Sequence, residues 1–135
     1  METSNSQKDL IFLKKEEGRK YHLGPMTAIF KADEKETDSQ YSVSEWWLEP
    51  NSEGPGAHSH DNYDEIFYVI EGTISFFIDD KWEDAAEGTF IRIPTNMLHT
   101  FANRTNKKAG MLNFKIPGGF ERNLPSMEEW FIDKE

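Results

Sequence analysis

The sequence contains no cysteine, so it has neither a disulfide framework nor a thiolate metal site. It also lacks any apolar run near the roughly 18 residues that a transmembrane helix needs, and we expect no membrane-spanning segment. The first residues, METSNSQKD, are polar and do not show the charged-then-apolar pattern of a signal peptide. These absences predict a cytoplasmic protein.

Basic residues are scarce as well. The chain has 15 Lys and Arg against 25 Asp and Glu, which gives a formal net charge of -10. Binding to phosphate groups needs clustered cations, and the one basic cluster, residues 103–108, has the composition of a hairpin turn. The composition therefore argues against a nucleic-acid partner, and we expect a small-molecule substrate instead.

Turn-forming residues divide the chain into short segments. Gly, Pro, Asn and Asp recur about every 8–12 residues, a spacing typical of short strands in a β-sandwich or barrel. Only the tail, residues 124–135, has a helical pattern, with Ser126 as the expected N-cap. We predict a single all-β domain over residues 1–135 that ends in a short helix and begins with a flexible segment, residues 1–9.

The most hydrophobic part of the chain is residues 65–78, where apolar side chains occupy consecutive positions. A strand with two apolar faces is typical of the inside of a sandwich, or of a sheet that contacts a second copy. Apolar side chains on the outward faces of residues 40–48 and 66–78 favour the second arrangement, and we expect a homodimer.

Three of the four histidines and one glutamate form a candidate metal site. His58 and His60 are two apart, so in an extended chain both project to the same face. The turn-rich residues 61–64 allow the next strand to begin with Glu65 facing the same interior. His99 adds a third imidazole from a later strand. Three imidazoles and one carboxylate suit a divalent transition metal.

The spacing of these residues resembles the two signature motifs of the cupin superfamily. Residues 54–72 hold the first motif: His58-Ser-His60, four residues, Glu65, six residues and Gly72. Residues 88–103 hold the second: Gly88, five residues, Pro94-Thr-Asn96, two residues, His99, three residues and Asn103. Asn96 replaces the usual glycine, and position 52 is Ser where the first motif normally opens with Gly. Neither departure affects a candidate ligand.

The resemblance implies a fold and a metal. Cupins are conical, jelly-roll-like barrels, also called double-stranded β-helices, with the metal inside. The four residues His58, His60, Glu65 and His99 fall on the family's ligand positions. The implied cofactor is a divalent transition metal, either Fe, Mn, Ni, Cu or Zn, and the sequence does not choose among them.

The rest of the chain resembles small single-domain cupins that are similar to quercetin dioxygenases. This similarity implies a dioxygenase that acts on a small aromatic or enolic molecule, with substrate and O2 meeting at the metal. Glu65 would then be both ligand and catalytic base, which requires surroundings that raise its pKa. Alternatives are another cupin enzyme, such as a sugar isomerase or decarboxylase, and a non-catalytic binding protein. The candidate substrate-pocket residues are Trp46, Tyr63, Phe67, Phe77, Phe101 and Phe114.

Overall fold

The computed structural model describes residues 9–60 and 62–134, so the flexibility expected of residues 1–9 falls almost wholly outside the described residues. Within this part of the chain, short strands follow one another and two helical segments come last. The strands are β1 Arg19–Leu23, β2 Met26–Ala32, β3 Ser42–Leu48, β4 Ser52–Glu53, β5 Asp64–Glu71, β6 Thr73–Ile78, β7 Lys81–Ala86, β8 Phe90–Ile93, β9 His99–Asn103 and β10 Ala109–Ile116. The helical segments are the 3-10 helix η2, Phe120–Asn123, and the α-helix α1, Leu124–Lys134.

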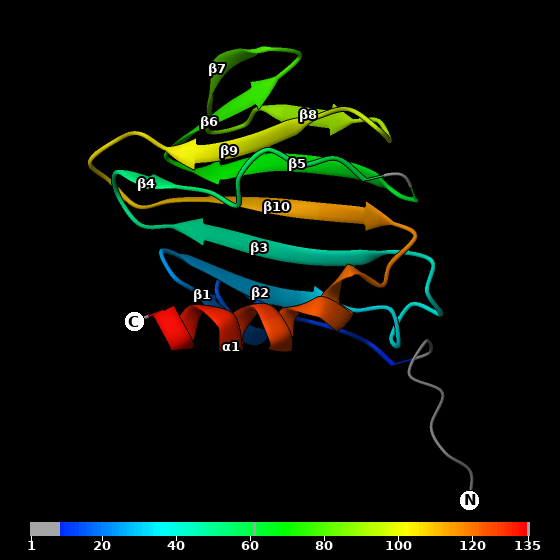
Figure 1. The fold of residues 1–135 in the computed structure, drawn as a ribbon. Coiled ribbons are helices and arrows are strands. Elements are labelled where there is room, and N and C mark those ends of the chain that lie inside the picture. Colours follow the sequence, from blue (N-terminus) through cyan, green and yellow to red (C-terminus); the bar gives the residue numbers. More distant parts are fainter. Residues whose placement is uncertain (1–8, 61, 135) are drawn as a thin grey trace, which may run out of the picture.

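The strands form two antiparallel sheets (Figure 1). The larger sheet has six strands in the order β1-β2-β3-β10-β5-β8, and the smaller has four in the order β4-β9-β6-β7. Neighbours in each sheet are mostly distant in sequence, as when β10 lies between β3 and β5. The all-β, jelly-roll-like fold predicted from the sequence is confirmed.

The hydrophobic core fills the space between the two sheets. Strand alternation sends every second side chain inward, and the inward set is almost entirely apolar in β2 and β6, whereas β5 sends Glu65 inward together with Phe67 and Val69. Phe67 from the larger sheet and Phe76 and Phe101 from the smaller meet with ring centroids 5.2–6.0 Å apart. Aromatic contacts at this separation stabilise the join between the two layers.

The outward face of the larger sheet is also apolar. Strand alternation places Tyr68 and Phe90 on this face, where they are paired across β5 and β8 and are 41% and 63% exposed. The remaining outward apolar side chains on neighbouring strands are Val43, Ile66, Ile70, Leu112, Phe114 and Ile116. This outer apolar face lies on strands that the sequence predicted to be apolar on both sides.

The C-terminal helix lies against the edge of the larger sheet, where α1 contacts β1 (Figure 1). A helix at the tail was predicted, but the expected N-cap at Ser126 is wrong because α1 begins at Leu124. Pro125 is tolerated in this first turn because its missing N–H would have had no helical partner there. Across residues 9–60 and 62–134, no helix is long and apolar enough to cross a membrane.

Two motif residues that are not candidate metal ligands, Asn96 and Asn103, have clear structural roles. Asn96 adopts a left-handed conformation, with φ of 69°, which asparagine tolerates better than most residues and which explains its place at a glycine position. The buried Asn103 side chain donates to the carbonyls of Leu48 and Lys107 and accepts from the Thr105 backbone N–H. Asn103 thereby fixes the turn between β9 and β10.

Candidate metal centre

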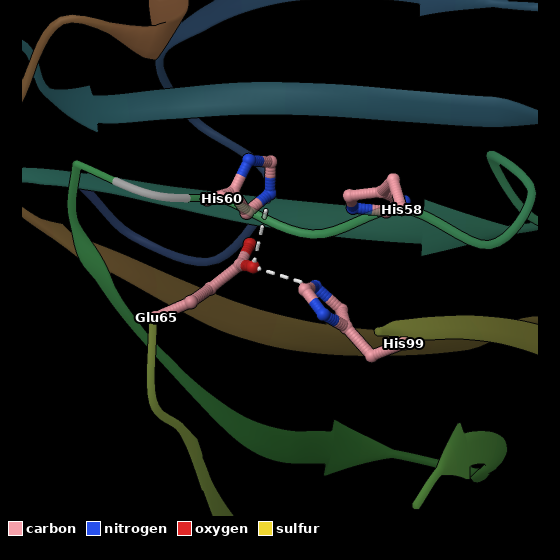
Figure 2. Close-up of side chains that lie close together, drawn as sticks. All are labelled: His58, His60, Glu65 and His99. Carbon is pink, nitrogen blue, oxygen red and sulfur yellow. Dashed lines mark hydrogen bonds and ion pairs between the residues drawn. The ribbon is translucent and has the colours of Figure 1, made fainter. Parts of the chain in front are cut away.

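The four predicted ligand residues converge between the two sheets. His58 and His99 pair through their backbones: each N–H donates to the other's carbonyl, at 2.9 and 2.8 Å. Gly54 allows the loop before His58 to approach β9 closely, because a Cβ at that position would lie 2.0 Å from the Phe101 carbonyl oxygen. Glu65 is the second residue of β5, so its carboxylate reaches the same space from the larger sheet (Figure 2).

Each imidazole is oriented by a hydrogen bond at Nδ1. The His58 Nδ1 lies 2.7 Å from the Gly56 carbonyl oxygen, and the His99 Nδ1 lies 2.8 Å from that of Met97. Because a carbonyl can only accept, these two Nδ1 atoms carry the proton and leave a lone pair on Nε2. The His60 Nδ1 lies 2.7 Å from the Tyr63 hydroxyl, which can accept a hydrogen bond from it. Such partners select the tautomer that binds a metal.

The facing atoms fit a shared cation. The His99 Nε2 lies 3.0 Å from Glu65 Oε1, and the His60 Nε2 lies 3.5 Å from the same oxygen (Figure 2). Two lone-pair atoms at this distance repel one another unless a cation or proton lies between them. Ligands about 2.1 Å from one ion and at right angles are about 3.0 Å apart. All four ligand atoms lie within 4.8 Å of one another, slightly more than the roughly 4.2 Å between opposite ligands of one ion, so a small inward shift brings this donor set onto a transition metal.

Electrostatics keep the His58 and Glu65 side chains in the forms that bind metal. Burial lowers the pKa of His58, which favours its neutral imidazole. Burial acts to raise the pKa of Glu65, but opposing influences, the Lys115 charge first among them, hold this pKa well below the usual range. The expectation that the surroundings raise the pKa of Glu65 is therefore wrong, and this carboxylate stays ionised. Its role as a catalytic base stays a prediction.

Lys115 and Asn113 hold the far side of the Glu65 carboxylate, and the sequence reasoning did not identify either residue. Lys115 Nζ lies 2.6 Å from Glu65 Oε2, and Asn113 Nδ2 donates to the same oxygen at 3.1 Å. Lys115 and Asn113 are 5% and 1% exposed. The available signal was two polar residues at alternate positions of an otherwise apolar strand, which must share one face. With Oε2 occupied, Oε1 is the oxygen that faces the histidines.

The cluster borders a small cavity. Its volume is about 40 Å³, which is room for roughly three water molecules. His60 and Phe120 line this cavity and also line a more open hollow of about 440 Å³ that includes Arg122. The remaining residues of the inner cavity are Met26, Trp46, Pro55, His58, Glu65, Phe67, Phe101, Asn113, Lys115 and Met127.

Comparison with known proteins decides the family. Residues 44–115, more than half of the chain, match the family described as Cupin domain. The chain belongs to the cupin family. The matched residues include all four members of the candidate metal cluster, so in this cupin the geometry described above falls within the shared domain.

One curated relative and two solved structures are similar to this cupin. Quercetin 2,3-dioxygenase of Bacillus subtilis (strain 168) is 30% identical over 112 residues, which is 78% of this chain but only 31% of that protein's length. An RmlC-like cupin from Shewanella frigidimarina NCIMB 400 superposes with a TM-score of 0.70 at 15% identity, covering 86% of this chain and 98% of that one. A predicted oxalate decarboxylase from Thermotoga maritima gives 0.71 at 16%, covering 81% and 99%. The two structures support the fold.

The aromatic side chains predicted to line the substrate pocket of this cupin divide into three groups. Trp46, Phe67 and Phe101 line the inner cavity. Tyr63 contacts His60 and lines the outer hollow. Phe77 and Phe114 line neither space. Whether any of them contacts a substrate stays a prediction.

Strand alternation explains the two that lie elsewhere. In β6, Phe76 points into the core, so Phe77 faces outward and contacts the Trp82 ring at a tilt of 53°, with ring centroids 5.4 Å apart. In β10, Asn113 and Lys115 take the inward positions and Phe114 joins the outer apolar face. Because both strands have apolar side chains on each face, their sequences did not reveal which face was inward.

Proposed function

We propose that the protein is a metal-dependent, dioxygenase-like enzyme that acts on a small enolic molecule. The observation that carries this proposal is the cluster of three imidazoles and one carboxylate, whose ligand atoms lie within 4.8 Å of one another beside a small cavity. A divalent transition metal bound there would supply a Lewis acid with open positions where an enolate oxygen and O2 can meet. The resemblance to the Bacillus quercetin 2,3-dioxygenase supports the same reaction class.

The residues around the cluster suit this chemistry. Gly56, Tyr63 and Met97 orient the imidazoles, and Lys115 and Asn113 orient the carboxylate, so the donor atoms are held before any ion arrives. The apolar walls formed by residues such as Phe67 keep bulk water from the reacting atoms.

The cavity volume favours a small enolic substrate over a large aromatic one. A space of about 40 Å³ holds only a few non-hydrogen atoms, whereas a flavonol has more than twenty. A larger substrate would require Phe120 or Met127, both of which line the cavity, to move. Substrate size is therefore a direct test of the proposal.

The first experiment measures the metal. Protein purified without added metal is analysed for Fe, Mn, Ni, Cu and Zn, next to the variants His58→Ala and His99→Ala. Removal of one ligand should lower the metal content at least about tenfold. His22→Ala is the matched control, because His22 is an exposed histidine outside the cluster. Unchanged metal content in both ligand variants would exclude this site.

The second experiment measures oxygen uptake by the metal-loaded protein with a small 1,3-diketone and with a flavonol. We expect uptake with the small enol and little with the flavonol. Absence of uptake above that of the metal-free protein with both compounds would refute the dioxygenase proposal. Release of CO2 from a small keto acid without O2 would instead indicate a decarboxylase. Ligand binding without turnover would indicate a non-catalytic cupin.

A further inference from the structure

Lys115 is a buried cation in the wall of the inner cavity. Its ammonium group lies 2.6 Å from Glu65 Oε2 and 2.5 Å from Asn113 Oδ1. An ammonium group has three N–H donors, and among the described residues these two oxygens are its hydrogen-bond acceptors. One donor is therefore left for another acceptor.

Aromatic rings occupy the remaining side of the ammonium group. Lys115 Nζ lies 4.5 Å from the ring centroid of Phe120 and 5.8 Å from that of Tyr63. A cation over an aromatic face is stabilised, but less than one that donates to a charged oxygen. A ligand oxygen that enters the cavity next to Phe120 would therefore be a better partner for the third N–H than the rings are.

The formal charges around the cavity also favour an anion. Among the residues that the structure describes, Glu65 is the one acidic residue that lines the cavity, and Lys115 already balances it. The three histidines bind a metal in their neutral form, so the two positive charges of a divalent ion remain uncompensated. Buried charge is costly without a counter-charge, and an anionic ligand supplies one.

We propose that Lys115 makes the cavity beside the histidine–glutamate cluster a binding site for a small organic anion, such as a carboxylate or an enolate. This inference rests on the proposed function in one respect, since it takes the cluster to hold a divalent metal. It specifies the substrate class: a compact molecule that carries a negative charge, with one oxygen toward the metal and one toward Lys115.

The test uses the full-length protein loaded with Co²⁺ and titrated with acetate and with acetamide. These two ligands have nearly the same shape and differ in charge. Changes in the visible absorption of Co²⁺ and the heat of binding both report occupancy without any turnover. Acetate should bind more tightly than acetamide, by roughly 10- to 100-fold, since a charged hydrogen bond distinguishes them.

Three variants assign that preference to Lys115. Lys115→Met keeps the length of the side chain but removes its charge, and should reduce the preference for acetate at least about tenfold, while the preference that Co²⁺ itself gives a carboxylate remains. Lys115→Arg keeps the charge and should retain the preference, which separates a charge effect from damage to the fold. Lys108→Met, an exposed lysine that pairs with Glu16, should behave like the unmodified protein.

Several outcomes would overturn the inference. These are equal affinity for acetate and acetamide, no acetate-dependent change, or a preference that is undiminished in Lys115→Met. Failure of the protein to take up Co²⁺ would overturn both the inference and the proposed function. Anion binding that depends on Lys115, in a protein that shows no oxygen uptake, would support the inference and refute the dioxygenase proposal, so the two failures are distinguishable.

Discussion

Replacing Glu65 with glutamine in the metal-free protein should leave the Lys115 cation buried without its counter-charge. The two groups are 4% and 5% exposed, and their nearest atoms are 2.6 Å apart. Breaking a buried ion pair by removing one partner costs about 3–5 kcal/mol. Asn113 and the Phe120 ring still contact Lys115 in the variant, so we expect a loss near 3 kcal/mol in the free energy of unfolding.

The double variant Glu65→Gln/Lys115→Met removes both charges and should be less destabilised than the sum of the two single variants. The expected coupling between the two substitutions is about 2–3 kcal/mol. Urea denaturation followed by tryptophan fluorescence, with a chelator present, measures all three variants. Glu16→Gln is the control, because Glu16 belongs to an exposed pair and should change stability by less than about 1 kcal/mol.

The same ion pair predicts how stability depends on pH. The pKa of Glu65 is lower in the folded protein than its ordinary value of 4.5. Its contribution to stability is therefore complete above about pH 4.5 and is lost as the pH falls toward the folded-state pKa. The unmodified protein should lose up to about 1.4 kcal/mol per pH unit more than Glu65→Gln in that range. Parallel pH profiles, together with a coupling near zero, would refute the assignment of a stabilising buried pair.

Three further predictions concern the cavity, the packing and the quaternary structure. Phe120→Ala should join the inner cavity to the outer hollow, so the affinity of Co²⁺-loaded protein for benzoate should rise relative to acetate; an unchanged ratio would mean that Phe120 does not separate the two spaces. Gly110→Ala would put a Cβ 2.4 Å from the Trp47 ring, and urea denaturation should show a loss of about 1–3 kcal/mol; full stability would contradict this packing. The outer apolar face, together with the exposed apolar residues 10–13, predicts that a second copy of the chain covers this surface. Light scattering should then find a dimer that Tyr68→Glu converts to a monomer with unchanged circular dichroism, and a monomeric unmodified protein would contradict it.

The sequence by itself was sufficient to predict the fold class and the four members of the cluster. In an extended segment, alternation over two residues places His58 and His60 on one face. The spacing from Gly88 to Asn103 likewise located His99, and asparagine's tolerance of a left-handed backbone explained Asn96. These are local properties of the chain, so they can be predicted without knowing which segments pack against one another.

Other features depended on which strands lie side by side. Phe77 and Phe114 face away from the inner cavity, which their sequences did not reveal because both strands are apolar on each face, and only pairing with neighbouring strands decides which face is inward. Lys115 reaches the carboxylate because β10 pairs with β5 in a register that sets it opposite Glu65, 50 residues earlier in the chain. That register also reversed the expected direction of the Glu65 pKa shift.

The sequence thus determined which residues form the candidate metal cluster, because residue identity and spacing are properties of single segments. The tertiary structure decided the charge and size of the space beside them, because those depend on Lys115 and on Phe120 and Met127, which come from β10, η2 and α1. Electrostatic and steric surroundings combine groups from several distant segments, and folding alone brings these groups together.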